Sequence, residues 1–169
     1  YISLDGGNSW EIKKLSNQQW WDTAISSDGK YILVSGRNFI GKSSDFGKTW
    51  NFLETPQEIT FCYNFDISDD GNIIGAVAHN SDSYVRVYVS MNAGQDWTQV
   101  TDVINPKNIR ISSTGKDMYV VGTYSFFRSS DFGESWTCVM SSSSYWKDLA
   151  VYNDGQKIMI GGNNLVRIV

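Results

Sequence analysis

Three aspartates are the side chains of this sequence that are best placed for acid–base chemistry. Asp22, Asp66 and Asp148 each lie in or beside a short apolar segment that is typical of a strand. Hydrolysis of a glycosidic bond requires two carboxyl groups about 5–10 Å apart across a cleft, so Asp22 and Asp148 form the candidate catalytic pair. The single histidine, His79, stands in a polar stretch between two predicted strands, where an exposed loop is expected and not a Ser-His-Asp site. The sequence offers these carboxylates no further support, so it favours a protein that is not an enzyme, without deciding the matter.

Aromatic side chains with amide or charged neighbours recur where the innermost strands are expected to begin. The four segments are 17–22, 60–64, 105–108 and 143–148. Aromatic faces beside hydrogen-bonding amides suit sugar rings and protein anchors alike. The sequence therefore predicts a ligand-binding rim that consists of Trp20, Trp21, Tyr63, Asn64, Tyr145 and Trp146.

Packing between repeats is the competing role for these aromatic residues. One aromatic per repeat is expected to pack against the neighbouring unit, and Trp21, Tyr63 and Trp146 fit that role best. The second aromatic of each segment is then the better candidate for exposure, which applies to Trp20, Phe61 and Tyr145. Both roles stay open for the set as a whole.

The elements that position these side chains follow from a phrase that returns four times. The pattern Ser-x-Asp-x-Gly-x-x-Trp occupies residues 3–10, 43–50, 90–97 and 129–136, with Asn92 in place of Asp in the third copy. Its closing tryptophans are spaced by 40, 47 and 39 residues. A second phrase, which ends in a glycine turn, runs in step at residues 25–29, 67–71, 111–115 and 151–155. A period of about 40 residues is the length of a four-stranded propeller blade.

Short apolar runs between these markers predict strands and not helices. Runs at 31–34, 73–77, 118–121 and 157–160 are bounded by Gly, Asn and Ser, and no stretch has a helical apolar period. We expect one all-β domain over residues 1–169, with repeats at 20–58, 59–103, 104–142 and, jointly, 1–19 plus 143–169. Val166–Val169 followed by Tyr1–Ser3 is similar to the strand at 85–90. The two ends therefore either complete one blade and close a small ring, or belong to an arc of a larger propeller.

The repeated phrase resembles the Asp-box, or BNR repeat, of β-propellers found in sialidases, Vps10-type sorting receptors, xyloglucan hydrolases and photosystem II assembly factors. The resemblance covers all four repeats and implies a β-propeller, but it implies no single activity. Sialidases grip a carboxylate with three arginines and carry an Arg-Ile-Pro motif, which this chain lacks. Arg86, Arg128 and Arg167 fall at equivalent repeat positions, so they indicate repeat structure and not a clamp. The xyloglucanase cleft lies between two large propellers, for which this chain is too short.

A tight hairpin corner explains the residue types of the phrase. The Asp or Asn side chain accepts backbone N–H groups, the Gly adopts a left-handed conformation, and the Trp packs an apolar face. One carboxylate per turn does not make a calcium site, so no metal is predicted. Trp50→Ala should destabilise the fold by about 3–5 kcal/mol if Trp50 is buried. The expected structural residues are Asp5, Gly7, Trp10, Asp45, Gly47, Trp50, Asn92, Gly94, Trp97, Asp131, Gly133 and Trp136.

The composition of the chain excludes some classes of binding partner. The formal net charge is -4, so nucleic acid is not an expected partner, and no apolar segment approaches the ~18 residues of a membrane span. Cys62 and Cys138 fit either a disulfide or, better, two small buried thiols, and no Cys/His cluster suggests zinc. No cofactor is predicted. The chain opens at Tyr1 without Met, so we expect a processed product or a segment of something longer. The compartment is not determined by the sequence, and an extracellular or surface-exposed location is slightly favoured.

Three functions remain open at this stage. The first is a non-catalytic interaction module that binds a glycan or a protein through the aromatic-rich rim. The second is a glycoside hydrolase, sialidase-like or xyloglucanase-like, or a fragment of one. The third is a structural domain of a surface or virion assembly, within a larger chain or complex.

Overall fold

The computed structural model describes residues 1–15, 19–37, 39–56, 59–163 and 165–168. These residues form β-strands joined by turns, and the one short 3-10 helix among them, η1, covers Asn153–Gly155. The strands are β1 (Trp20–Ile25), β2 (Ile32–Gly36), β3 (Phe39–Ser43), β4 (Asn51–Leu53), β5 (Ile59–Ile67), β6 (Ile74–Asn80), β7 (Val85–Ser90), β8 (Thr98–Val100), β9 (Pro106–Ile111), β10 (Met118–Gly122), β11 (Ser125–Ser129), β12 (Thr137–Ser141), β13 (Trp146–Tyr152), β14 (Lys157–Gly162) and β15 (Leu165–Ile168).

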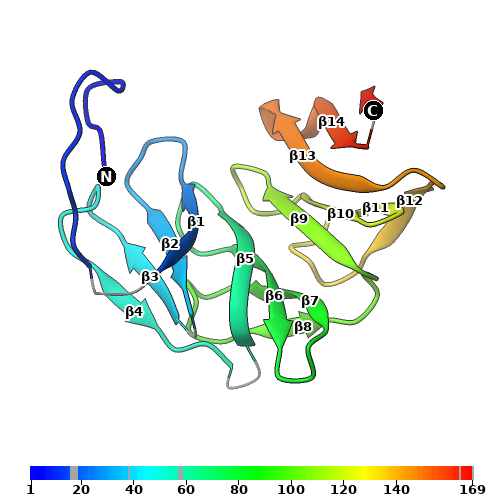
Figure 1. Cartoon of the computed structure of the whole chain (residues 1–169), viewed down its shortest axis with the longest axis horizontal. Helices are drawn as coiled ribbons and strands as arrows, with labels where there is room; N and C mark the ends of the chain where they lie inside the picture. The colour runs from blue at the N-terminus through cyan, green and yellow to red at the C-terminus, as the bar shows by residue number, and fades with distance from the viewer. Residues whose placement is uncertain (16–18, 38, 57–58, 164, 169) are drawn as a thin grey trace.

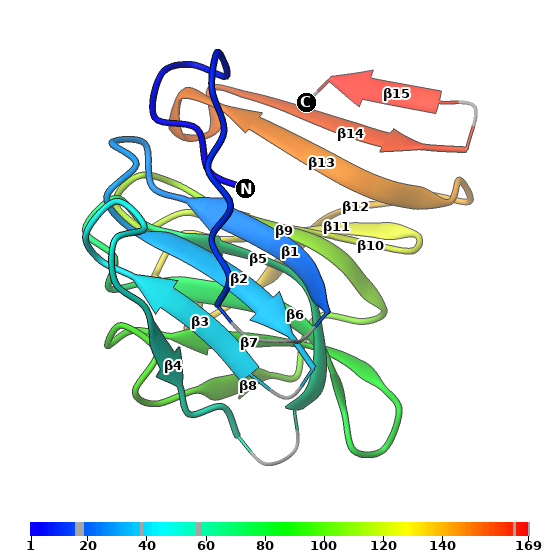
Figure 2. The ribbon, with the colours of Figure 1, turned by 60° about the vertical axis from the view of Figure 1, so that its left-hand side comes forward.

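Four antiparallel sheets stand around a common axis as the blades of a β-propeller, which confirms the predicted fold class. Blades 1 to 3 contain β1–β4, β5–β8 and β9–β12 in sequence order, and blade 4 contains β13–β15. The inner strands β1, β5, β9 and β13 follow one another around the axis (Figure 1). Figure 2 shows blade 1 with its strands stepping outward from β1 to β4. The second, third and fourth Asp-box phrases join the third strand of a blade to the fourth, whereas the first lies between Ile2 and Glu11, before β1.

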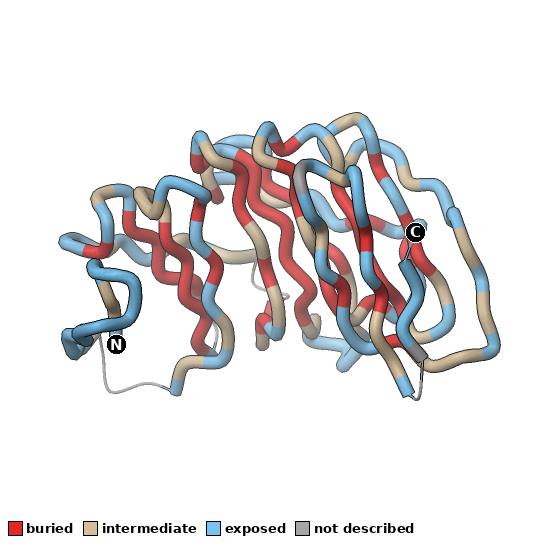
Figure 3. Tube along the Cα trace, turned by 90° about the horizontal axis from the view of Figure 1, so that it is seen from above, coloured by how far each residue is buried: buried red, intermediate tan, exposed pale blue. Residues whose placement is uncertain are grey.

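The core consists of three hydrophobic clusters, one between each consecutive pair of blades. Leu33 and Ile40 of blade 1 pack on Phe65 and Ile74 of blade 2. The two further clusters join blade 2 to blade 3 and blade 3 to blade 4. The buried residues therefore lie along the middle of the strands in every blade (Figure 3). Because successive side chains of a strand point to opposite faces, each middle blade supplies both of its faces to the core.

In the part of the chain that the structure describes, the first residues do not pair with the strands of blade 4. Ile168 pairs with Met159 in blade 4 as Val89 pairs with Gly75 in blade 2, so Ile168 and Val89 take equivalent positions. Val89 stands directly before the box serine of blade 2. Ile2 also directly precedes a box serine, so residues 1–3 would duplicate the end of β15 and cannot extend it. Within the described residues, Ile2 instead bridges Glu11, and the two ends lie on opposite sides of the arc (Figures 1 and 3). Val169, part of the predicted joined strand, lies outside the described residues.

The Asp-box corners are held by side chains that bond to the backbone. In the second corner, Ser43 Oγ accepts the Gly47 N–H at 2.9 Å, and Asp45 accepts the Thr49 N–H and hydroxyl at 2.8 and 2.6 Å. Trp50 Nε1 donates to the Gly47 carbonyl at 3.1 Å. The first and fourth corners have the same network, which gives the phrase the structural role predicted from its residue types.

The third corner keeps this geometry, but the donor and the acceptor of the bond between its two side chains are exchanged. Asn92 replaces the aspartate, and Asp96 stands where the other corners have a serine or threonine. The Asn92 amide donates to the Asp96 carboxylate at 2.8 Å, while Asn92 Oδ1 accepts the Asp96 N–H at 2.8 Å. An amide can donate where a carboxylate can only accept, so the two replacements compensate each other.

Exposure differs from expectation at two kinds of residue. Trp50, Trp97 and Trp136 are half-buried, whereas Trp10 is 61% exposed because its corner is attached to the Ile2–Glu11 bridge and not to a full described sheet. Both cysteines are free thiols; Cys62 is buried as expected, but its counterpart on β12 is exposed. Because Trp50 is half-buried, the destabilisation expected for Trp50→Ala lies at the low end of the range of about 3–5 kcal/mol.

Replacing a box tryptophan tests the contribution of the corners to stability. Trp97 packs against the cluster between blades 1 and 2, so Trp97→Ala should lower the free energy of unfolding by about 2–3 kcal/mol. Trp10→Ala, at the exposed equivalent position, should lower it by less than about 1 kcal/mol. Urea denaturation followed by far-UV circular dichroism measures both values. Equal losses in the two variants would contradict the packing role.

The box aspartates make stability sensitive to acid. Hydrogen bonds from the Thr49 and Ser135 hydroxyls, followed by those from the backbone N–H groups of the same residues, lower the pKa of Asp45 and of Asp131 to about 2, from 3.8. A lowered folded-state pKa gives stability that is present above pH 4 and is lost as the pH falls towards 2.

We expect the melting temperature to fall between pH 4 and pH 2. Asp131→Asn should make this fall shallower, because the group that must be protonated is removed. Asp82→Asn, an exposed carboxylate on the β6–β7 turn, is the control and should leave the slope as it is. Melting curves recorded across this range by circular dichroism decide the result.

Candidate binding rim

An extra residue interrupts every inner strand at the same place. In β1, Trp20 pairs with Gly36 and Asp22 with Ser35, so Trp21 has no partner in the ladder. The equivalent unpaired residues are Tyr63 in β5, Lys107 in β9 and Lys147 in β13. A β-bulge of this kind bends the strand and turns one side chain away from the regular alternation. Four bulged residues, two aromatic and two basic, therefore mark one rim of the propeller.

An Asp or Asn follows each bulge and connects neighbouring blades. The Asp22 carboxylate accepts the Phe65 N–H and the Asn64 amide of blade 2, both at 3.0 Å. Asn64 Oδ1 in turn accepts the Ile109 N–H of blade 3 at 2.8 Å. These bonds satisfy backbone groups of the next inner strand, so they fix how each blade sits on its neighbour.

The link from blade 3 to blade 4 is built differently. Asn108 Nδ2 donates to Asp148 Oδ1 at 2.6 Å, and that same oxygen accepts the Leu149 N–H of its own strand at 2.9 Å. Asn108 Oδ1 is consequently buried without a hydrogen-bond partner among the described residues. The predicted site residues Asn64 and Asp148 are thus both engaged between blades.

The candidate catalytic carboxylates have structural partners. Asp22 and Asp148 are hydrogen bonded between blades as described, and Asp66 accepts the Ile111 N–H at 2.8 Å. Burial raises the pKa of Asp66, opposed by its bonds to the Ile111 and Ile67 N–H groups and by the charge of Arg110. Among the described residues, no group of three His, Cys, Asp or Glu side chains is arranged to hold a metal ion. The geometry therefore explains these residues through blade docking.

A row of exposed and half-buried rings, which we call the aromatic strip, runs along the rim of blades 1 and 2. It consists of Trp21, Phe61, Tyr63 and His79, with ring centroids 4.5, 4.8 and 4.8 Å apart in that order. Trp21 is 48% exposed and Tyr63 is 40% exposed. His79 belongs to strand β6 and packs on Tyr63, so the predicted exposed-loop position is wrong. The sequence pattern named Phe61 as a candidate for exposure but missed His79 as a member of this row.

The rim of blades 3 and 4 has a different character. The Lys107 and Lys147 ammonium groups lie 6.0 and 5.8 Å from the centre of the Tyr145 ring. Tyr124 meets the same ring edge-on at 6.2 Å. This basic–aromatic cluster, Lys107, Tyr124, Tyr145 and Lys147, places two positive charges on a protein whose net charge is -4. Tyr145, which was expected to be exposed, is half-buried beside these two charges.

The bulge changes which aromatic of each pair is buried. Trp146 is 2% exposed and packs between blades 3 and 4, as predicted. Its equivalents are Trp20, half-buried edge-on against Phe39, and buried Cys62, whereas Trp21 and Tyr63 correspond to the exposed Lys147. Assigning Trp21 and Tyr63 to the inter-blade core and Trp20 to exposure was wrong, because the extra residue shifts the alternation by one. Residues 17–18 of the predicted rim lie outside the described residues.

The comparisons with known proteins agree with this architecture. The model of the BNR-Asp box repeat matches residues 126–139, which include the fourth corner. No curated protein matches the chain. A solved structure described as YCF48 bound to D1 peptide has a TM-score of 0.64 and 16% identity, over 94% of this chain and 55% of that one. A GH74 enzyme of Niastella koreensis has a TM-score of 0.66 and 14% identity, over 85% of this chain and 26% of that one. An ancestral GH74 enzyme has a TM-score of 0.63 and 15% identity, over 84% of this chain and 22% of that one.

These similarities concern the fold. The chain carries Asp-box repeats and is a β-propeller, and it spans about half the length of the YCF48 chain and about a quarter of the GH74 enzymes. At such low identity, a shared fold does not transfer an activity. The described residues include no helix with the length and apolar character to cross a membrane.

Replacing Asn64 tests whether the Asp and Asn side chains that follow the bulges hold neighbouring blades together. Asn64→Ala removes the acceptor of the Ile109 N–H and one donor to Asp22, so it should lower the free energy of unfolding by about 1–3 kcal/mol. Lys107→Ala, at a bulge of the same rim, should change it by less than about 0.5 kcal/mol. Chemical denaturation compares the two. A neutral Asn64→Ala would show that these bonds do not hold the blades in place.

Proposed function

We propose that this β-propeller is a non-catalytic binding module that recognises a protein segment through the aromatic strip on its inner rim. The observation that carries the proposal is the exposure of Trp21 and Tyr63 on either side of Phe61, at bulges of neighbouring inner strands. Exposed aromatic residues held by a rigid strand are effective anchors, because little conformational entropy is lost when they bind.

The two halves of the rim favour a particular kind of segment. The aromatic strip suits an apolar or aromatic side chain, while the Lys107 and Lys147 ammonium groups beside Tyr145 suit a carboxylate. An extended segment with an apolar residue and an acidic residue could contact both halves of the rim. The similar fold of YCF48, whose structure holds a D1 peptide, makes a peptide partner a reasonable choice over a glycan.

Glycoside hydrolysis receives less support. The similarity to GH74 enzymes is one of fold, and the candidate pair Asp22 and Asp148 is engaged in bonds between blades. A purely architectural role does not use the exposed strip. Both alternatives are separated from binding by the measurements below.

Selection from a displayed library of random linear peptides tests the proposal. Peptides that pair an aromatic or aliphatic residue with an acidic residue should be enriched, and Trp21→Ala should weaken their binding by about tenfold or more, the loss of one anchor. Phe52→Ala, an exposed aromatic on the outer strand β4, is the matched control and should bind as the unchanged protein does.

Two further assays distinguish the alternatives. Binding of the protein to a glycan array that is lost in Trp21→Ala would show that the ligand is a carbohydrate and not a peptide. Turnover of fluorogenic glycosides that is lost in Asp22→Asn or Asp148→Asn would replace binding with catalysis. If neither the library nor the array gives a ligand sensitive to Trp21→Ala, the strip is not a binding site.

A further inference from the structure

Residues 2–11 have the pairing of the outer half of a blade. Ile2, directly before a box serine, bridges Glu11, directly after a box tryptophan, by two backbone hydrogen bonds of 2.9 and 2.8 Å. Val89 and Thr98 hold the same two positions in blade 2, where they pair the third strand with the fourth. The first corner is therefore the outer half of a further blade, and the described sheets give it no first or second strand.

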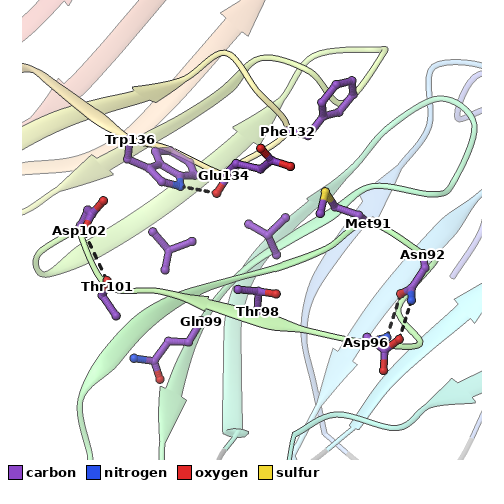
Figure 4. Close-up of a pocket in the computed structure, with 13 residues that line it drawn as sticks. Met91, Asn92, Asp96, Thr98, Gln99, Thr101, Asp102, Phe132, Glu134 and Trp136 are labelled. Atoms are coloured by element: carbon purple, nitrogen blue, oxygen red, sulfur yellow. Dashed lines mark hydrogen bonds between the residues drawn. The ribbon is translucent and has the colours of Figure 1, made fainter.

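This half blade lies on blade 1 in the way that blades lie on one another elsewhere in the arc. Ile2 contacts Gly47 in the corner of blade 1, and Val89 of blade 2 contacts Gly133 in the corner of blade 3. Both glycines are the box glycine, so the two contacts are equivalent. Figure 4 shows the second of these junctions, where the third and fourth corners lie side by side. Residues 2–11 thus mark the place where a blade docks behind blade 1.

The inner half of that place is open. Ile25 ends strand β1 and is 58% exposed. Ile67 and Ile111 end strands β5 and β9, and they are only 4% and 9% exposed because each packs on the preceding blade. The free face of blade 1 is therefore apolar and uncovered where the inner strands of a neighbouring blade would lie.

Blade 4, at the other end of the arc, has the opposite deficiency (Figure 1). Among the described residues it has its first three strands but no fourth, so β15 has an unpaired outer edge. Met159 and Val166 on its free face are 47% and 67% exposed, whereas Tyr119 and Phe126, at the equivalent ladder positions of blade 3, are 2% and 1% exposed. A hollow of about 150 Å³ opens beside Met159 and Val166.

The two free faces do not cover each other within one copy. The three hydrophobic clusters of the described residues join blades 1 and 2, blades 2 and 3, and blades 3 and 4, and none of them joins blade 4 to blade 1. One end of the arc thus lacks the inner strands of a blade, and the other end has those strands without a fourth strand beside them.

We propose that a second copy of this chain docks its blade 4 behind blade 1, and that two copies close one ring of eight blades. Blade 4 of one copy supplies the first three strands of the shared blade, and residues 2–11 of the other supply its corner and the start of its fourth strand. Ile168 of the second copy takes the place of Ile2 and bridges Glu11, because Ile168 and Ile2 hold the same repeat position. An unpaired strand edge is a ready template for such pairing.

The ring size selects two copies over a larger number. The contact between blade 4 and blade 1 joins two different surfaces, and contacts of this kind close into a ring when the rotation allows it. Propellers have about four to eight blades, so two copies of four blades reach the upper end of that range, and a third copy would exceed it.

The central contact of the new interface repeats one that is already present. Leu33 of blade 1 and Ile67 of blade 2 belong to the cluster between these blades. Met159 holds the ladder position of Leu33 in its own blade, and Ile25 holds that of Ile67. Met159 of one copy is therefore expected against Ile25 of the other. Burial of two exposed apolar faces supplies the driving force.

Sedimentation-velocity ultracentrifugation of residues 1–169 over a range of concentrations tests the proposal. The protein should shift from one copy to two, with no larger species, because two copies complete the ring. Met159→Lys and Ile25→Glu should each raise the dissociation constant about tenfold or more, since each places a charge in an apolar contact. Both side chains are exposed in the single copy, so neither variant should change the melting temperature of the dilute monomer.

An equimolar mixture of the two variants provides a sharper test. In the mixed pair, one junction brings the introduced ammonium group against the introduced carboxylate, and the other junction has the unchanged Met159 and Ile25. The mixture of Met159→Lys with Ile25→Glu should therefore dimerise about tenfold more tightly than either variant alone. A loss of association caused by misfolding would not recover on mixing.

Control variants separate this interface from other surfaces. Val139→Lys changes an apolar side chain on β12 that is 50% exposed, close to the exposure of Met159, and should leave association unchanged. Trp21→Ala should also leave it unchanged, so failure here is distinct from failure of the binding rim. A protein that stays monomeric, assemblies larger than two copies, a dimer insensitive to Met159→Lys, or variants that do not recover on mixing would each overturn the proposal.

Discussion

Side-chain hydrogen bonds from one inner strand to the backbone of the next are the interaction on which the rest of the structure depends. A four-stranded sheet buries its apolar faces only when another blade covers them, and hydrophobic contact alone does not fix how far one sheet slides on its neighbour. Asp22 accepts the Phe65 N–H and Asn64 accepts the Ile109 N–H, and these two bonds fix the position of each blade on the next. Directional bonds set the register, and the three clusters between blades then supply most of the stabilisation.

The bulge before each of these residues connects stability with recognition. It lets the Asp or Asn turn towards the next blade, and the same extra residue turns its own side chain out towards the rim. Trp21 and Tyr63 are exposed on one half of the rim, while Lys107 and Lys147 flank Tyr145 on the other. Because the bulge backbone is common to all four inner strands, the rim residues are free to differ between blades without disturbing the docking.

Differences between repeats show where the scaffold tolerates change. The third corner has Asn92 with Asp96 in place of Asp with a hydroxyl residue. The bond between the two side chains survives with donor and acceptor reversed, and the bond from the backbone N–H is unchanged. Between the outer strands, Lys42 and Val89 take the same ladder position, and only Lys42 donates hydrogen bonds to carbonyl groups of the next blade. A repeat that keeps its corners and its inner-strand bonds can thus acquire a separate surface at each junction between blades.

The sequence by itself determined the all-β class, the four repeats, the corner residues and the candidate aromatic segments, because turns and strand periods are local and recur visibly at near-constant spacing. It left Trp146 open between the binding rim and the core, and burial of its side chain places it in the core. Only the tertiary structure decided that Trp21 and Tyr63 are the exposed members of their pairs, since one bulged residue reverses every inference based on alternation. The path of the chain ends and the free faces of blades 1 and 4 were equally out of reach, because each depends on ladder register and on how the blades cover one another.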